Sequence, residues 1–214
     1  MKGLLAKDLA LMLQRGRVFI FLLVWGIVIA LVMDSNTYSI GWIVMVATIS
    51  SISTISYDEY DNCMPFLMSL PVTRREYAIE KYVFSAAAGV ISWVLAVLIG
   101  TIACVLKGSL LPTGQDFLGM LAYMPVILLI ISVMIPPQLK WGPEKGRTVM
   151  MVAFGVAAVV IFLVERYAGG VEGAMKAMGS LSLPGVFLGI AAVCIALTAL
   201  SIWLSIRIME KKEF

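Results

Sequence analysis

The sequence predicts an all-α membrane protein, and both its composition and the length of its apolar runs support this prediction. Of the 214 residues, 61% are hydrophobic and only 14% are charged, and the mean hydropathy is +1.00. A soluble domain carries about 25% charged residues. Because so few charges cannot cover a water-facing surface, we expect residues 1–214 to form a single domain within a lipid bilayer.

Six apolar runs predict six transmembrane helices. Each run is near the roughly 20 residues that a helix needs to cross the hydrocarbon core, and none contains Asp, Glu, Lys or Arg. The runs lack the alternation of a transmembrane barrel, so helices are the expected way to satisfy the backbone in lipid. No cleavage site follows the first run, which is therefore expected to remain as an anchor. The predicted spans are residues 18–33, 40–56, 82–106, 117–135, 148–164 and 186–206.

The distribution of basic residues predicts the orientation of the chain. The N-terminal segment, the loops 57–81 and 136–147 and the C-terminus together hold 13 Lys and Arg residues, against 3 in the remaining loops. Basic residues are enriched in cytoplasmic loops. Both termini and the two charged loops are thus expected in the cytoplasm, with loops 107–116 and 165–185 on the outer side.

Residues 2–17, "KGLLAKDLALMLQRGR", predict an amphipathic helix before the first span. At helical spacing Leu5, Leu9 and Met12 share an apolar face, whereas Asp8 lies on the polar face. Such a helix is expected to lie in the cytoplasmic interface of the membrane. The alternative is a polar lead-in with no structural part of its own.

The chain lacks the residues that catalysis and metal binding usually require. It has no His, the commonest metal ligand and general base, and its three Cys are scattered without ligand spacing. No phosphate-binding GxxxxGK[ST] motif is present. No ionisable side chain lies in the middle of a predicted span, which argues against an ion-coupled carrier. We therefore expect neither catalytic residues nor a metal or cofactor on this chain.

Small hydroxyl residues end the second predicted span, "ATISSISTIS". Side chains of this kind support close packing between membrane helices. They can also line a polar pathway for a transported molecule. Under the second interpretation the candidate residues are Ser50, Ser53 and Thr54.

The loop 57–81, "YDEYDNCMPFLMSLPVTRREYAIEK", predicts a short helix followed by a corner. Asp58, Glu59 and Asp61 are expected to begin this helix, because negative charges are favoured at a helix N-terminus. Pro65 complicates a regular helix, because proline lacks a backbone donor. The helix has two interpretations: it rests on lipid, or it docks into a groove of a soluble partner.

The second part of this loop predicts the start of the third membrane helix. Thr73 and Glu76 have the T-x-x-E spacing of a capping box. The helix is therefore expected to begin near Arg74, before its apolar portion. Its first two turns would hold Arg74, Arg75 and Lys81 at the level of the lipid headgroups.

Four short segments, in this order and with this topology, resemble a known family. They are "MKGLLAKDL", "SLPVTRREYAIEKY", "IPPQLKWGPEKGR" and "IRIMEKKEF". The chain resembles the small six-helix permease subunits of type-2 ABC transporters, which are encoded apart from their ATPase. The resemblance covers the whole chain in topology, but only these motifs residue by residue.

The resemblance implies an export permease that is driven by a separate ATPase. The partners implied are this ATPase, which would bind ATP and Mg, a second permease copy or homologue, and the lipid bilayer, with no nucleic acid. The substrate would be a peptide or an amphipathic small molecule; the alternative function is a non-transporting anchor or sensor that recruits a soluble partner. The ATPase-docking residues implied in the coupling helix are Asp58, Glu59, Asp61, Phe66, Leu67 and Leu70. A second cytoplasmic contact would involve Glu144, Lys145 and Arg147.

Overall fold

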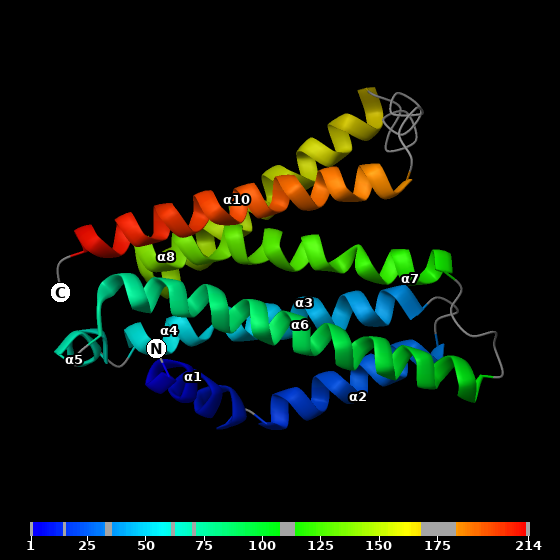
Figure 1. Ribbon diagram of the computed structural model, residues 1–214, viewed down its shortest axis with the longest axis horizontal. Coiled ribbons are helices and arrows are strands. Elements are labelled where there is room, and N and C mark those ends of the chain that lie inside the picture. Colours follow the sequence, from blue (N-terminus) through cyan, green and yellow to red (C-terminus); the bar gives the residue numbers. More distant parts are fainter. Residues whose placement is uncertain are drawn as a thin grey trace.

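The described part of the chain is α-helical (Figure 1). The computed structural model describes residues 2–14, 16–32, 36–60, 63–69, 72–107, 114–167 and 183–212. The helices are α1 (Lys2–Gln14), α2 (Gly16–Val32), α3 (Asn36–Ile52), α4 (Thr54–Tyr60), α5 (Cys63–Ser69), α6 (Arg74–Leu106), α7 (Gly114–Leu121), α8 (Tyr123–Tyr167) and α10 (Leu183–Lys211).

Among the described residues, four helical segments are long and apolar enough to cross a membrane. They overlap the second, third, fourth and sixth predicted spans. The first predicted span corresponds to α2, whose described apolar part is shorter, and the fifth lies in the second half of α8. The structure therefore supports four of the six predicted spans, and the first and fifth stay predictions. The four segments are Tyr38–Glu59, Arg74–Leu106, Gly119–Gly142 and Leu188–Lys211.

The long helices run side by side and place the N-terminal and C-terminal helix ends at the same end of the bundle (Figure 1). The N-terminal helix α1, the short helix α5 and the last turn of α10 lie at one end of the bundle. The reversal in α8 lies at the same end. We call this the basic end, because it gathers the segments that hold most of the Lys and Arg residues. That this end faces the cytoplasm stays a prediction.

The core of the bundle consists of aliphatic side chains from α3, α6 and the first half of α8. Ile40 and Val44 on α3 and Ile127 and Ile131 on α8 are almost fully buried. Helices α3 and α8 approach α6 closely at Gly89, where a Cβ would lie 2.6 Å from the Ile127 side chain. Many large apolar side chains outside this core are exposed. Such a surface suits a protein whose surroundings are lipid tails.

The N-terminus of α6 is fixed by the capping box that the sequence predicts. The Glu76 backbone N–H donates to the Thr73 hydroxyl at 3.2 Å, and the Thr73 backbone N–H donates to the Glu76 carboxylate at 3.0 Å. These two bonds satisfy donors that a helix N-terminus leaves free. The helix accordingly starts at Arg74, two turns before its uncharged run.

The segment expected as a loop, residues 136–147, is instead part of the helical hairpin α8. Helical backbone continues through Pro136 and Pro137 and is interrupted at Gly142, whose φ of 77° and ψ of −179° reverse the chain. Backbone with positive φ is open to glycine and costly for residues with a Cβ. The prediction of a twelve-residue loop was wrong, because the chain reverses at Gly142 and the residues on either side of it are helical.

Candidate functional site

The short helix α5 presents one aromatic side chain to its surroundings. Met64 and Leu67, three residues apart, face the core and are buried. Phe66 lies on the other side of α5 and is 67% exposed. Pro65 lies in the first turn, where a helix has no partner for the missing N–H, so α5 is a regular helix. The geometry therefore separates the anchoring residues of α5 from one residue available for contact.

Two of the acidic residues of this segment, Asp58 and Glu59, do not begin α5. Asp58 and Glu59 lie near the C-terminal end of α4 (Thr54–Tyr60), so the expectation that they open the short helix was wrong for both. A helix C-terminus carries a partial negative charge and disfavours carboxylates. Lysines stabilise these acids instead, as described below. Asp61 and Leu70 lie outside the described residues.

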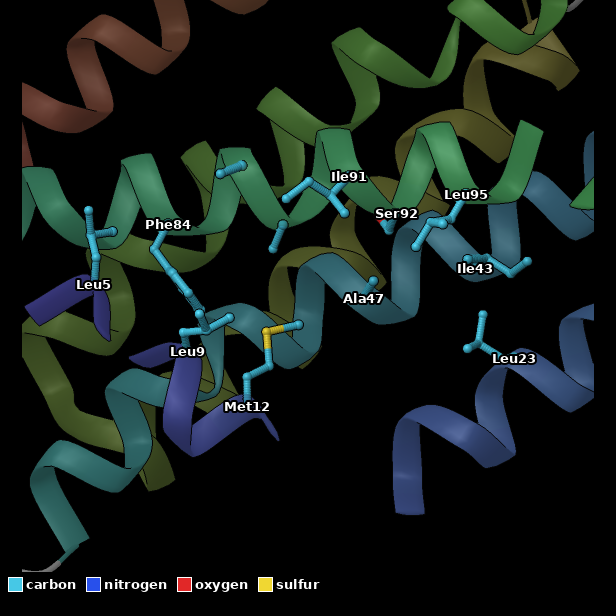
Figure 2. Close-up of a pocket in the computed structure, with 12 residues that line it drawn as sticks. Leu5, Leu9, Met12, Leu23, Ile43, Ala47, Phe84, Ile91, Ser92 and Leu95 are labelled. Atoms are coloured by element: carbon cyan, nitrogen blue, oxygen red, sulfur yellow. The ribbon is translucent and has the colours of Figure 1, made fainter. Parts of the chain in front are cut away.

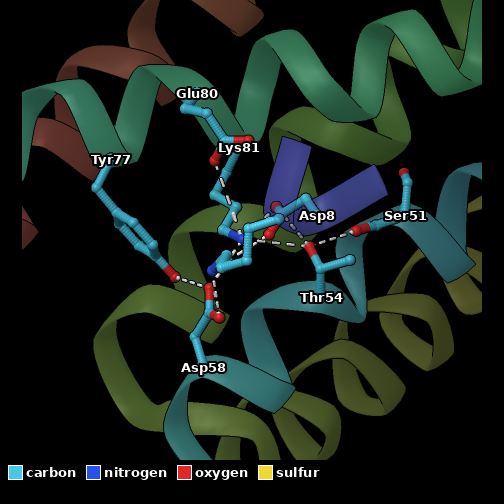
Figure 3. Close-up of polar contacts among 8 residues, drawn as sticks. Asp8, Ser51, Thr54, Asp58, Tyr77, Glu80 and Lys81 are labelled. Atoms are coloured by element: carbon cyan, nitrogen blue, oxygen red, sulfur yellow. Dashed lines mark hydrogen bonds and ion pairs between the residues drawn. The ribbon is translucent and has the colours of Figure 1, made fainter. Parts of the chain in front are cut away.

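Four charged residues from three helices form a compact group that we call the charged cluster: Lys7, Asp8, Asp58 and Lys81 (Figure 3). Lys81 of α6 contacts Asp8 of α1 and lies 2.9 Å from the Asp58 carboxylate of α4. Lys7 of α1 pairs with the other oxygen of Asp58. Asp8 is fully buried and Lys81 is 1% exposed. The cluster thus ties α1, α4 and α6 together beside α5.

Neutral groups satisfy part of the hydrogen bonding of the charged cluster, whereas Oδ1 of Asp8 has no hydrogen-bond partner among the described residues and lies 3.3 Å from the Lys7 ammonium. The Tyr77 hydroxyl donates to Asp58 at 2.9 Å. The Thr54 hydroxyl lies 3.1 Å from the Asp8 carboxylate and accepts from Lys81 at 3.3 Å. Such partners matter because buried ion pairs are stable only when their remaining donors and acceptors are satisfied.

Burial and pairing have opposite effects on Lys7. Burial lowers the pKa of the Lys7 ammonium, but its hydrogen bond with Asp58 and its attraction to Asp58 and Asp8 outweigh that effect. The pKa of Lys7 is therefore raised above its usual value. Lys7 therefore stays charged at neutral pH.

The cluster changes how two parts of the sequence are interpreted. Lys81, expected at the level of the headgroups, is buried in the bundle because two carboxylates compensate its charge. The polar face of α1 turns inward as well, since Lys7 and Asp8 contact α4 and α6. Sequence reasoning missed the pairing of Asp8 with Lys81. The sequence places an acid on the N-terminal helix and a lysine just before an apolar run, but this pattern does not show that the two residues pair.

A second set of contacts fastens the end of α10 to the same region. Lys212 pairs with Glu59 and donates to the Leu139 carbonyl at 3.2 Å. Arg74 at the start of α6 donates to the carbonyls of Glu210 and Lys212 at 3.1 and 2.6 Å. A cation at a helix C-terminus satisfies free carbonyls and complements the helix dipole. Helices α4, α6, α8 and α10 are therefore joined at the basic end.

The predicted second contact lies directly after the reversal in α8. Lys145 is exposed on the second arm of the hairpin. Glu144 and Arg147 belong to the same turn of α8, but their side chains lie outside what the structure describes. At Gly142 an added Cβ would lie 2.5 Å from the Glu59 carboxylate. The hairpin thus packs closely against the end of α4.

The hydroxyl residues that end the second span are partly committed to other contacts. The Ser53 hydroxyl donates to the Ile49 carbonyl at 3.0 Å, at the break between α3 and α4. Thr54 is buried and belongs to the surroundings of the charged cluster. Ser50 is half-buried. That these residues line a pathway stays a prediction.

An apolar cavity lies between α1, α2, α3 and α6 (Figure 2). Its volume is about 390 Å³. Leu5, Leu9 and Met12, the residues predicted to share the apolar face of α1, line one side of it, and Phe84 of α6 lines another. Pockets for small molecules usually measure about 300–1,000 Å³ and are mostly apolar. This cavity has the size and chemistry for an apolar group.

Together, the fold and the site define a class: a multi-helix membrane protein with a short helix that projects an aromatic residue at the end where both termini lie. Comparison with known families identifies the family itself. The family model described as "ABC-2 family transporter protein" matches residues 3–210, and the chain therefore belongs to this family, a membrane component of transport systems. No curated protein and no solved structure matches the chain.

Proposed function

We propose that this chain is the membrane-spanning permease subunit of an ATP-driven exporter. A separate ABC ATPase would dock at the basic end and bind ATP and Mg, and its cycle would drive the permease. Membership of the ABC-2 family supports this proposal, since permeases of the family generally work with an ATPase subunit. The absence of a phosphate-binding motif from the sequence agrees with hydrolysis on another chain.

The observation that carries the proposal is the exposure of Phe66 on an anchored helix. A large aromatic side chain that is exposed outside the membrane-spanning segments is a typical anchor for a pocket of a partner protein. Met64 and Leu67 hold α5 against the core, so the backbone from which Phe66 projects has a fixed position. Of the residues implied for docking, Asp58 and Leu67 are buried, and they would support α5 rather than contact the ATPase.

The charged cluster gives a route by which docking reaches the membrane helices. Helix α4 follows directly from α3, and α6 follows α5 after a short connection. Because Asp58 of α4 pairs with both Lys7 and Lys81, a displacement of α5 would be shared among α1, α3 and α6. Rigid packed elements that move together are the usual carriers of such coupling.

The orientation and assembly belong to the same proposal. The basic end would face the cytoplasm of a cell-membrane protein, because 13 of the 16 Lys and Arg residues belong to the segments predicted there. Two permease chains, identical or homologous, would work with two ATPase subunits. The apolar cavity favours an amphipathic small molecule that enters from the bilayer as substrate, because its lining offers few polar groups to a peptide backbone.

The test uses Phe66→Asp, with Phe66→Leu as the matched control. Because the side chain is exposed, neither variant should change the melting temperature of the purified permease by more than a surface substitution does. Phe66→Asp should abolish co-purification of the cognate ATPase or uncouple hydrolysis from transport, whereas Phe66→Leu should keep both. The permease alone should show no ATPase activity.

Two results would oppose the proposal in different ways. If Phe66→Asp assembles and transports like the parent, α5 is not the docking site. If the complex forms through Phe66 but moves no substrate when ATP is hydrolysed, the chain is a membrane anchor or sensor that recruits a soluble partner.

A further inference from the structure

A strongly basic pocket lies at the basic end, between the first arm of α8 and the last turns of α10. Its volume is about 380 Å³. Lys140 comes from α8, Arg207 and Lys211 come from α10, and Lys212 directly follows α10, with Leu204 and Ile208 completing the lining. The lining contains no acidic residue.

Most of these cations are not neutralised within the described part of the protein. Lys212 is occupied by its ion pair with Glu59. Lys140, Arg207 and Lys211 form no ion pair with any side chain that the structure describes. Three positive charges that converge on one pocket without a counter-charge create a site for an anion.

Two tryptophans place this pocket at the depth of the lipid headgroups. The Lys140 ammonium lies 4.6 Å from the centre of the Trp141 ring, and the Arg207 guanidinium lies 4.1 Å from that of Trp203. Both rings are about half exposed. Tryptophan is enriched at the boundary between hydrocarbon and water, where basic side chains extend toward the headgroups.

The outer face of α10 has the polarity of a phospholipid. Leu197, Leu200 and Leu204 follow one another on one side of the helix and are all exposed. At helical spacing, Arg207 and Lys211 continue the same face into the last turn of α10. An acyl chain can lie along the leucines while its headgroup reaches the two cations.

We propose that this pocket binds the headgroup of an anionic phospholipid, with an acyl chain along α10. The charge selects an anionic phosphate, and the adjoining leucines select a lipid over a soluble anion. Basic pockets between membrane helices on the cytoplasmic side bind lipid headgroups in this way. The inference does not depend on ATPase docking or on transport, since it rests on α8 and α10 alone.

The experiment titrates the purified full-length protein, in a neutral detergent, with short-chain phosphatidylglycerol and separately with phosphatidylcholine. The shift in melting temperature reports binding. Two exposed charges are removed in Arg207→Gln/Lys211→Gln. The matched control, Arg75→Gln/Lys145→Gln, removes two exposed charges at the same end of the protein but outside the pocket. The conservative variant Arg207→Lys/Lys211→Arg keeps the charge of the site.

The parent should be stabilised by phosphatidylglycerol far more than by phosphatidylcholine. The pocket variant should lose roughly thirtyfold in affinity for phosphatidylglycerol, since each basic residue near an anionic headgroup contributes about fivefold. The matched control and the conservative variant should retain the affinity of the parent. Melting temperatures without lipid should agree among all four proteins, because the altered side chains are exposed.

Three outcomes would overturn the proposal. Equal stabilisation by both lipids would show that the headgroup charge is not recognised. An equal loss in the pocket variant and the matched control would assign the effect to general surface charge. If inorganic phosphate or glycerol phosphate binds as tightly as phosphatidylglycerol, the site takes a soluble anion and the leucine face contributes nothing.

Discussion

Replacing Lys81 by Met tests the charged cluster most directly. Lys81 is 1% exposed and its ammonium faces the carboxylates of Asp8 and Asp58. The Glu80 carboxylate lies 4.0 Å from the same ammonium. Met has nearly the same length and no charge, so the substitution removes the charge with little change in packing. It leaves Asp8 and Asp58 with Lys7 as their one described cationic partner, and it removes the one described ion pair of the buried Glu80.

The burial of the cluster sets the size of the effect. Removing one partner of a buried ion pair costs about 3–5 kcal/mol, because the remaining charge is left without compensation. This is a large share of the roughly 5–15 kcal/mol that holds a typical domain folded. Lys7→Met should cost less, because the Lys7 side chain is 29% exposed and water replaces part of its pairing.

The assay is the free energy of unfolding of the purified permease, measured by denaturant titration in detergent micelles. The control is Lys145→Met, which removes an exposed lysine and should change stability by less than about 0.5 kcal/mol. The double variant Lys81→Met/Asp8→Asn removes both charges of one ion pair, the ammonium and the carboxylate. Its destabilisation should be smaller than the sum of the single effects by about 1–3 kcal/mol.

The reasoning would be refuted by equal stability of Lys81→Met and Lys145→Met. It would also be refuted by strict additivity of Lys81→Met and Asp8→Asn, because additivity would mean that the two groups do not interact. A loss of stability in Lys7→Met larger than that in Lys81→Met would contradict the ranking by burial.

Two further substitutions test the corners at the basic end. Gly142→Ala should destabilise the α8 hairpin by about 1–3 kcal/mol through its backbone conformation alone, because φ of 77° with ψ of −179° is essentially restricted to glycine. The loss should be larger still, because the added Cβ would lie 2.5 Å from the Glu59 carboxylate. Melting curves of Gly142→Ala with and without Glu59→Ala separate the two causes, and full recovery in the double variant would exclude backbone strain. Thr73→Ala should cost about 1 kcal/mol through the lost cap and increase hydrogen exchange in the first turn of α6, so unchanged exchange at Glu76 and Tyr77 would contradict the role of the capping box.

Much of the fold could be predicted because a bilayer imposes strong rules. Long uncharged runs in lipid become helices, and four of the predicted spans coincide with helical segments of sufficient length and apolarity. The T-x-x-E spacing predicted the start of α6, because a capping box depends only on residues three apart. The reversal in α8 was not predicted, since nothing in the sequence shows that Gly142 alone would turn the chain.

The candidate site could be predicted only in part, for a related reason. The sequence identified the segment that holds α5 and proposed Phe66 for docking, and the structure leaves that side chain exposed. It did not show that Asp58 and Leu67 would be buried. Their neighbours come from distant helices, and the pairing of Asp8 with Lys81 spans 73 positions in the chain.

The sequence by itself determined that this protein lies in a lipid bilayer, where its apolar runs are, and that basic residues are concentrated in alternate segments. These follow from local composition, since each run must be long enough to cross the hydrocarbon and free enough of charge to stay there. Only the tertiary structure decided which charges are buried together. Lys7, Asp8 and Lys81 could each have faced water, and packing α1 against α4 and α6 made them partners.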